Sequence, residues 1–201
     1  MNNEKMIKTA KTSYTVVSVL RILVLIGMIL FILGCVILLV MGASSIPFSF
    51  TSLSMGNVTL YLSETALPDQ TIGAAEILPM LLPSGVIMAV VFYCLSVLRR
   101  ILTPMKEGRP FETSVSGHIR KLGNAVLIGG AANFVAQAAA SFFLKGRFEL
   151  LKGLFREGVI DHITVTHTFS LNVVWIALFL YLLSYIFAYG EELQRQSDET
   201  L

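Results

Sequence analysis

The chain has 201 residues, of which 55% are hydrophobic and only 14% are charged. Soluble domains carry about 25% charged residues, so this composition excludes an ordinary soluble globule coated by charge. The net charge of +2 is too small to indicate direct binding of nucleic acid, and a mean hydropathy of +0.75 favours a membrane protein.

Four stretches without Asp, Glu, Lys or Arg divide the chain. Each has about 20 residues, which is enough for a helix to cross a hydrocarbon core of about 30 Å. The stretches are Ile22–Gly42, Ile77–Leu98, Leu122–Leu144 and Thr168–Gly190. We therefore expect a mainly α fold, a four-helix transmembrane bundle that forms a single integral membrane domain over residues 1–201.

The first stretch has features in common with a cleaved signal peptide, because its flank is basic and small residues follow at 41–43. Its apolar run is longer than the roughly 7–15 residues of a signal peptide's apolar region. We therefore expect this stretch to be retained as the first membrane span.

Basic residues are concentrated on one side of the four stretches. The N-terminal tail and segment 99–121 are rich in Lys and Arg, whereas segment 43–76 contains none. Because cytoplasmic loops carry an excess of Lys and Arg, we expect both chain ends and the inner loop 99–121 to be cytoplasmic. The outer loops are then 43–76 and 145–167, although the second also carries basic residues.

The first outer loop has the alternation of β-strands. Apolar residues occupy every second position in Val58–Leu62, and an alternating run from Phe48 precedes the turn-forming pair Gly56-Asn57. Two such runs joined by a short turn are typical of a β-hairpin. A third alternating run, Ile163–Phe169, lies in the other outer loop. Since a lone hairpin is marginal in water, we expect a three-stranded extracytoplasmic cap.

The second outer loop also contains a helical pattern. Phe148, Leu151 and Phe155 fall on one helical face, and charged residues such as Lys152 fall elsewhere. This pattern predicts a separate amphipathic helix that lies on the outer membrane surface.

Asp161, His162 and His167 form a candidate outer site. The two histidines are five residues apart, so on one continuous strand they point to opposite faces. A zinc site needs three or four converging ligands, and we therefore predict neither a metal nor a cofactor. A pH-sensing role and an ordinary surface position are the remaining interpretations, of which we favour the second.

The third stretch carries a polar row at helical spacing, formed by Asn133, Gln137 and Ser141. One interpretation is a polar path or ligand groove, and the other is close helix packing, since small and amide residues serve both. We favour packing, because no ionisable residue lies in the middle of the stretch. In the fourth stretch, Tyr181, Tyr185 and Tyr189 share one face, which indicates interface anchoring and packing more than ligand contact.

A candidate docking surface combines basic and turn residues of the inner loop with the acidic C-terminal tail. Its members are Arg99, Arg100, Arg109, Phe111, Arg120, Glu191, Glu192, Gln194 and Asp198. Exposed ion pairs are worth only about 0–1 kcal/mol each, so their value lies in recognition of a partner. Two further interpretations, binding of anionic lipid head groups and ordinary positive-inside residues, fit Arg99, Arg100, Arg120 and Lys121, and we favour the second.

Two inner segments carry a family resemblance. They are Leu98–Leu102 with Gly108–Phe111 and Ile119–Gly123, and the ending Tyr189–Gln194 with Asp198–Leu201. With four spans in about 200 residues, they resemble the YoaS-like family of bacterial membrane proteins, a domain of unknown function. The resemblance implies a multi-pass protein of the bacterial inner membrane. It also implies a small cytoplasmic helix-turn-helix regulator as partner, and no catalytic residues.

The sequence contains no nucleophile elbow, phosphate loop, histidine–glutamate zinc motif or paired cysteines, so we expect no enzyme. Our first hypothesis is a sensor or regulator, or an immunity-type protein, that signals to a cytoplasmic partner from the lipid bilayer as a single chain or a homo-oligomer. The alternative is a small transporter or transporter subunit that uses the polar face of the third span. A membrane enzyme acting on lipids is a weaker third hypothesis, which would require Glu76, Asp161, His162 or His167.

Overall fold

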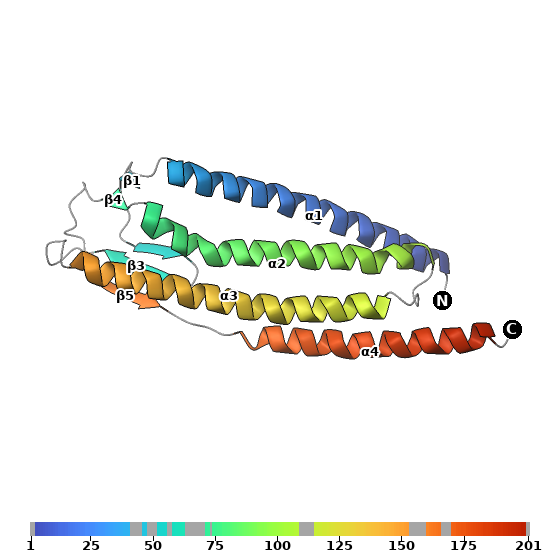
Figure 1. Cartoon of the computed structure of the whole chain (residues 1–201). Coiled ribbons are helices and arrows are strands. Elements are labelled where there is room, and N and C mark those ends of the chain that lie inside the picture. Colours follow the sequence, from blue (N-terminus) through green and yellow to red (C-terminus); the bar gives the residue numbers. More distant parts are fainter. Residues whose placement is uncertain are drawn as a thin grey trace. The chain divides into compact units, whose positions relative to one another are not determined.

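The computed structural model describes nine segments of the chain: residues 3–40, 46–47, 52–55, 58–62, 71–72, 74–108, 115–152, 160–165 and 170–199. Long helices dominate these segments (Figure 1). They are α1 (Asn3–Val40), α2 (Ala74–Lys106), α3 (Val115–Lys152) and α4 (Asn172–Glu199).

The prediction of four membrane-length apolar helices is confirmed. The parts long and apolar enough to cross a membrane are Ile7–Val40, Leu81–Lys106, Val115–Phe143 and Asn172–Ser197. Most apolar side chains of α1 are exposed, and within its described part only Val17 is buried. A continuous exposed apolar surface of this size is unfavourable in water and favourable in lipid.

Helix α1 begins well before the uncharged stretch, so the polar tail is helical in its described part. The first glycine of this helix is Gly27, and no proline interrupts it. The hydroxyls of Thr12 and Thr15 donate to the carbonyl oxygens of Lys8 and Lys11 at 3.1 and 3.0 Å. These threonines satisfy their polar groups within the helix, which allows it to continue from the tail into the apolar run.

The chain forms two compact units. The first comprises Met1–Gly27, Met88–Gly130 and Ser170–Leu201, and the second comprises Met28–Ile87 and Ala131–Phe169. Helices α1, α2 and α3 contribute to both units, whereas α4 belongs to the first.

The core of the first unit lies between the end of α2, the start of α3 and the middle of α4. Its buried centre consists of Val97, Ile101, Val115 and Ile119. The side chains packed around this centre are Met105, Leu122, Leu180, Leu183 and Phe187. Their apolar packing therefore brings the two ends of the inner loop next to α4.

Two adjacent glycines set the distances between the helices of the first unit. A Cβ atom on Gly129 would lie 2.5 Å from Cγ1 of Val90 in α2, and one on Gly130 would lie 2.5 Å from Cγ1 of Val173 in α4. Neither space accepts a methyl group. Glycine thus allows α3 to approach both neighbouring helices closely, as small residues do in membrane helix packing.

A glycine also shapes the turn after α2. Gly108 has a φ of +81°, a left-handed conformation that residues with a Cβ rarely adopt. Its N–H donates to the carbonyl of Met105 at 3.2 Å, and the N–H of Glu107 donates to the carbonyl of Pro104 at 3.1 Å. The predicted inner turn therefore begins with a glycine that closes α2, while its residues 109–110 lie outside the described part.

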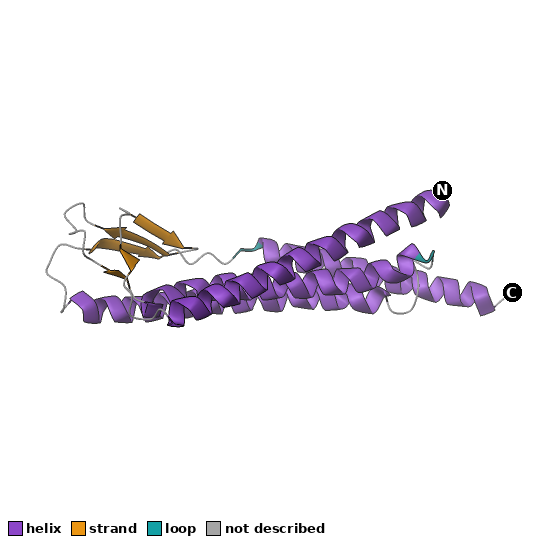
Figure 2. Ribbon diagram, turned by 90° about the horizontal axis from the view of Figure 1, so that it is seen from above, coloured by secondary structure: helices purple, strands orange, loops and turns teal. Residues whose placement is uncertain are grey.

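The second unit contains short strands, shown in orange in Figure 2. Strands β2 (Ser52–Met55), β3 (Val58–Leu62) and β5 (Ile160–Val165) pair antiparallel in the order β2-β3-β5. Strands β1 (Ile46–Pro47) and β4 (Thr71–Ile72) form a second antiparallel pair. The register between β3 and β5 shifts after Tyr61, which is typical of a bulge. The predicted turn at Gly56-Asn57 lies outside the described residues, and the cap as an extracytoplasmic domain stays a prediction.

The separate amphipathic helix predicted from Phe148 is wrong as far as the described residues extend. Helix α3 continues without a break from Val115 to Lys152 and includes this segment. The only weak helix former near the expected break is Gly146, and one glycine costs about 1 kcal/mol relative to alanine, too little to end a long helix. Residues 153–159, including Phe155, lie outside the described part.

Candidate functional site

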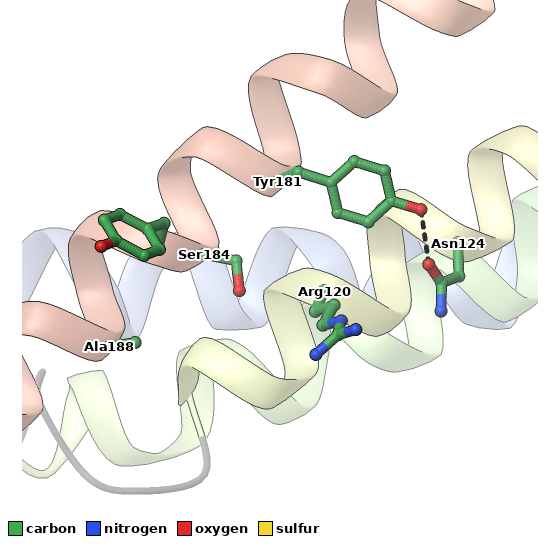
Figure 3. Close-up of a pocket in the computed structure, with 6 residues that line it drawn as sticks. Arg120, Asn124, Tyr181, Ser184 and Ala188 are labelled. Carbon is green, nitrogen blue, oxygen red and sulfur yellow. Dashed lines mark hydrogen bonds between the residues drawn. The ribbon is translucent and has the colours of Figure 1, made fainter.

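A cleft of about 450 Å³ opens between α3 and α4 in the first unit (Figure 3). Arg120 and Asn124 line it from α3. The α4 wall consists of Tyr181, Ser184, Tyr185 and Ala188. Side chains three or four residues apart lie on the same helical face, so each wall is one face of one helix.

A glycine and an asparagine of α3 contact Tyr181 of this cleft. A Cβ atom on Gly123 would lie 3.3 Å from Cε1 of Tyr181, so glycine lets the tyrosine ring lie close against α3. The Tyr181 hydroxyl donates to Oδ1 of Asn124 at 2.5 Å. This hydrogen bond satisfies the polar end of the tyrosine side chain.

Ser116 joins the first turn of α3 to α4 through three hydrogen bonds. Its backbone N–H and its hydroxyl donate to Oε1 and Oε2 of Glu191 at 3.0 and 2.9 Å. Its carbonyl oxygen accepts from the hydroxyl of Ser184 at 2.9 Å. The first N–H groups of a helix have no partner within the helix and favour negative charge, so Glu191 caps α3 from a neighbouring helix.

A second polar contact joins α1 to the end of α2. Nε of Arg99 donates to the Tyr14 hydroxyl at 2.9 Å, and its Cζ lies 5.2 Å from the centroid of the tyrosine ring. Nζ of Lys106 lies 4.2 Å from the same centroid. Tyr14 therefore binds two cations of α2 through its ring and one of them also through its hydroxyl.

The predicted docking residues divide into several groups. Arg99 contacts Tyr14, Arg120 lines the cleft and Glu191 caps α3. Glu192 accepts from Arg195 at 2.9 Å and from Gln196 at 2.9 Å. In the part of the chain that the structure describes, no ion pair joins the inner-loop arginines to the tail.

The structure describes the other members of this surface in less detail. Arg100 and Gln194 are exposed on α2 and α4. Arg109 and Phe111 lie outside the described residues, and the side chain of Asp198 is likewise undescribed. The exposed members therefore remain accessible to a partner, whereas Arg99 and Glu191 stabilise the first unit itself.

The polar row of α3 lies in the second unit. Ser141 is buried, and its hydroxyl donates to the carbonyl oxygen of Gln137 at 2.7 Å. The neighbouring Ala136 and Ala140 are buried as well, whereas the buried Oδ1 of Asn133 has no hydrogen-bond partner among the described residues. This side of α3 therefore faces the protein interior.

The candidate outer site is described only in part. Asp161 and His162 lie in β5, where His162 is in register with Tyr61, and His167 lies outside the described residues. Among the described residues no group of three or more His, Cys, Asp or Glu side chains is placed to hold a metal ion.

The sequence pattern did not indicate a functional or structural role for Tyr14, Ser116 or Asn124. Each is an ordinary polar residue whose importance comes from a partner far along the chain. Ser116 and Glu191 are 75 residues apart, and Asn124 and Tyr181 are 57 residues apart. The usable sequence signals were the charges of Arg120 and Glu191 and the tyrosines of α4, whose spacing placed them on one face.

The long apolar helices and their exposed apolar faces indicate a multi-pass helical membrane protein. Comparison of the chain with protein-family models, curated proteins and solved structures found no match. The resemblance to the YoaS-like family therefore stays a prediction.

Proposed function

We propose that this protein is a non-enzymatic sensor or regulator of a bacterial cell membrane that signals to a cytoplasmic partner. An immunity role against a membrane-active peptide belongs to the same class. The observation that carries the proposal is the contact of Glu191 with Ser116, since it links the start of α3 to the C-terminal part of α4. A shift of either helix would thus alter the inner loop and the tail together.

The contact of Arg99 with Tyr14 supports the same role, because it adds α1 and the end of α2 to the linked set. Both contacts involve charged groups, and charge-assisted hydrogen bonds are stronger and more directional than neutral ones. Arg100 on α2 and Gln194 on α4 have exposed side chains that are available to a partner. In the proposed mechanism, a signal outside the membrane changes the helix contacts, and the partner binds these exposed groups.

The proposed orientation places the strands β2, β3 and β5 outside the cell and both chain ends inside. Strand β3 lies in the chain between α1 and α2, whereas β5 lies between α3 and α4. Because β3 and β5 are hydrogen-bonded, the two connecting segments must lie on the same side of a membrane. A chain that crosses four times places these segments on one side, which supports four crossings.

Quantitative affinity purification from native membranes tests the proposed role. We expect a small DNA-binding regulator of the helix-turn-helix type to co-purify, and the double substitution Arg100→Gln and Gln194→Ala to reduce its recovery. The matched control replaces Trp175, an exposed residue of α4 outside this surface, with Leu. Recovery that is the same for all three proteins, or absent throughout, would contradict signalling through this surface.

Transport is the second candidate, and the buried Oδ1 of Asn133, which has no hydrogen-bond partner among the described residues, favours it. A polar atom buried without a partner costs about 1–3 kcal/mol, and a passing solute could supply the missing donor. Under this alternative an ATPase or carrier subunit co-purifies, and Asn133→Leu abolishes solute uptake. Unchanged uptake by that variant would exclude the polar row as a path.

A further inference from the structure

We propose that the α3–α4 cleft binds the phosphate group of one anionic phospholipid. This binding does not depend on the proposed signalling role, since it concerns only the first unit and the membrane around it. The cleft residues are those described above: Arg120, Asn124, Tyr181, Ser184, Tyr185 and Ala188.

The cleft lies at the membrane depth of the lipid head groups. Arg120 lies two positions before the uncharged stretch of α3 begins at Leu122, and Ala188 lies three positions before charges resume at Glu191 in α4. The cleft therefore lies where the uncharged stretches of both helices end at the same side. In a helix that spans the hydrocarbon core, this level is that of the lipid head groups.

The charge of the cleft lining suits a phosphate group. Arg120 is the only ionised side chain of the lining, it is exposed, and it forms no ion pair within the described part of the chain. The carboxylate of Glu191, one turn beyond Ala188, accepts hydrogen bonds from Ser116 instead. The lining therefore carries one positive charge and no negative charge, and a guanidinium group binds phosphate through two parallel N–H donors.

The cleft lining also contains further hydrogen-bond donors for a phosphate group. The Tyr181 hydroxyl donates a hydrogen bond to Oδ1 of Asn124, so the Nδ2 group of that amide is left as a donor. The hydroxyl of Ser184 is engaged with Ser116, whereas Tyr185 is 77% exposed and lines the opening. The donors that the cleft offers to a phosphate group are therefore the guanidinium of Arg120, the amide Nδ2 group of Asn124 and the hydroxyl of Tyr185.

An exposed apolar surface continues from the cleft along α3 and α4. Leu178, Leu182 and Tyr185 follow at spacings of four and three, so they share one face of α4, and all three are exposed. On α3, the exposed Ile128 lies one turn beyond Asn124. Both walls therefore lead from a polar end into apolar surface, which fits a lipid with acyl chains better than free phosphate.

Native mass spectrometry of the purified full-length protein tests the site, with titration of phosphatidylglycerol against phosphatidylcholine. We expect one phosphatidylglycerol to bind with clear preference, and Arg120→Gln to weaken this binding about tenfold, as loss of a charge-assisted contact predicts. Ala188→Trp, which fills the cleft without a change of charge, should weaken it to a similar extent. Inorganic phosphate added in excess should not displace the lipid.

The matched control is Arg100→Gln, which removes an exposed cation that does not line the cleft. This variant should bind phosphatidylglycerol as the unmodified protein does. Equal losses from Arg100→Gln and Arg120→Gln would mean general surface attraction and would overturn the proposal. Unchanged binding after Ala188→Trp, or displacement by inorganic phosphate, would overturn it as well. Unchanged thermal unfolding of each variant in detergent shows that a loss of binding is not a loss of fold.

Discussion

The carboxylate of Glu191 caps the first turn of α3 by accepting hydrogen bonds from the backbone N–H and the hydroxyl of Ser116 at 3.0 and 2.9 Å. A helix is usually capped by a residue just before it in the chain. Here the cap comes from another helix, so the same two bonds that satisfy α3 also fix the register of α4 against it.

Replacing Glu191 with Ala should therefore destabilise the protein. The change removes an acceptor and a negative charge from a helix N-terminus, and we expect a loss of about 1–3 kcal/mol in the free energy of unfolding. Glu191→Gln retains one acceptor oxygen and should cost less. Unfolding in mixed detergent micelles, followed by circular dichroism, measures both.

Glu192→Ala is the control for this pair. Among the described residues Glu192 bonds to Arg195 and Gln196 on its own helix, and the side chains of Arg195 and Glu192 are 64% and 45% exposed. Such an exposed pair contributes little to stability, so this variant should unfold almost as the unmodified protein does. Equal destabilisation by Glu191→Ala and Glu192→Ala would contradict a capping role.

The two glycines at the centre of α3 give a second prediction. A methyl group on Gly129 or Gly130 would overlap Val90 or Val173, and overpacking of this kind typically costs about 1–3 kcal/mol. Gly129→Ala and Gly130→Ala should each lower the unfolding temperature. Gly117→Ala is the control, because a Cβ atom there meets nothing within 4 Å and alanine favours the helix. A control that destabilises as strongly as either variant would refute close packing as the cause.

Two substitutions of Tyr14 distinguish the hydroxyl contact from the ring contact between α1 and α2. Tyr14→Phe removes the hydroxyl that accepts from Arg99 but retains the ring, and should lower the free energy of unfolding by a small amount. Tyr14→Leu also removes the ring that contacts Arg99 and Lys106 and should lower the free energy of unfolding further. The same unfolding measurement on both variants distinguishes the contributions; if Phe and Leu are equivalent, the ring binds no cation.

Cysteine labelling tests the proposed orientation. The native Cys35 and Cys94 are free thiols, so both are first replaced with Ala. A membrane-impermeant maleimide added to intact cells should then label a cysteine at Thr59 in β3 but not one at Gln194 in α4. Both should react after the membrane is opened. Labelling of Gln194→Cys in intact cells would reverse the orientation and with it the cytoplasmic partner.

The sequence by itself determined the class of this protein and the number of its long helices. An uncharged apolar run is a local property, and its burial in lipid depends on composition and length and not on a partner elsewhere in the chain. The same reasoning failed for the predicted amphipathic helix after Leu144, because residue patterning gives the polar and apolar faces of a helix but not the point at which one helix ends. Helix α3 continues to Lys152 since nothing there breaks it.

Only the tertiary structure decided the cap on α3, the close approach at Gly129 and Gly130, and the cleft around Arg120. Each depends on the register of two helices that are joined by long connections, and a shift of one residue would turn Ser116 away from Glu191. The hydrophobic pattern fixes which face of a helix is buried, but the distance between helices is set by side-chain volumes at the contact. That physical difference explains why the membrane class was visible in the sequence and the site was not.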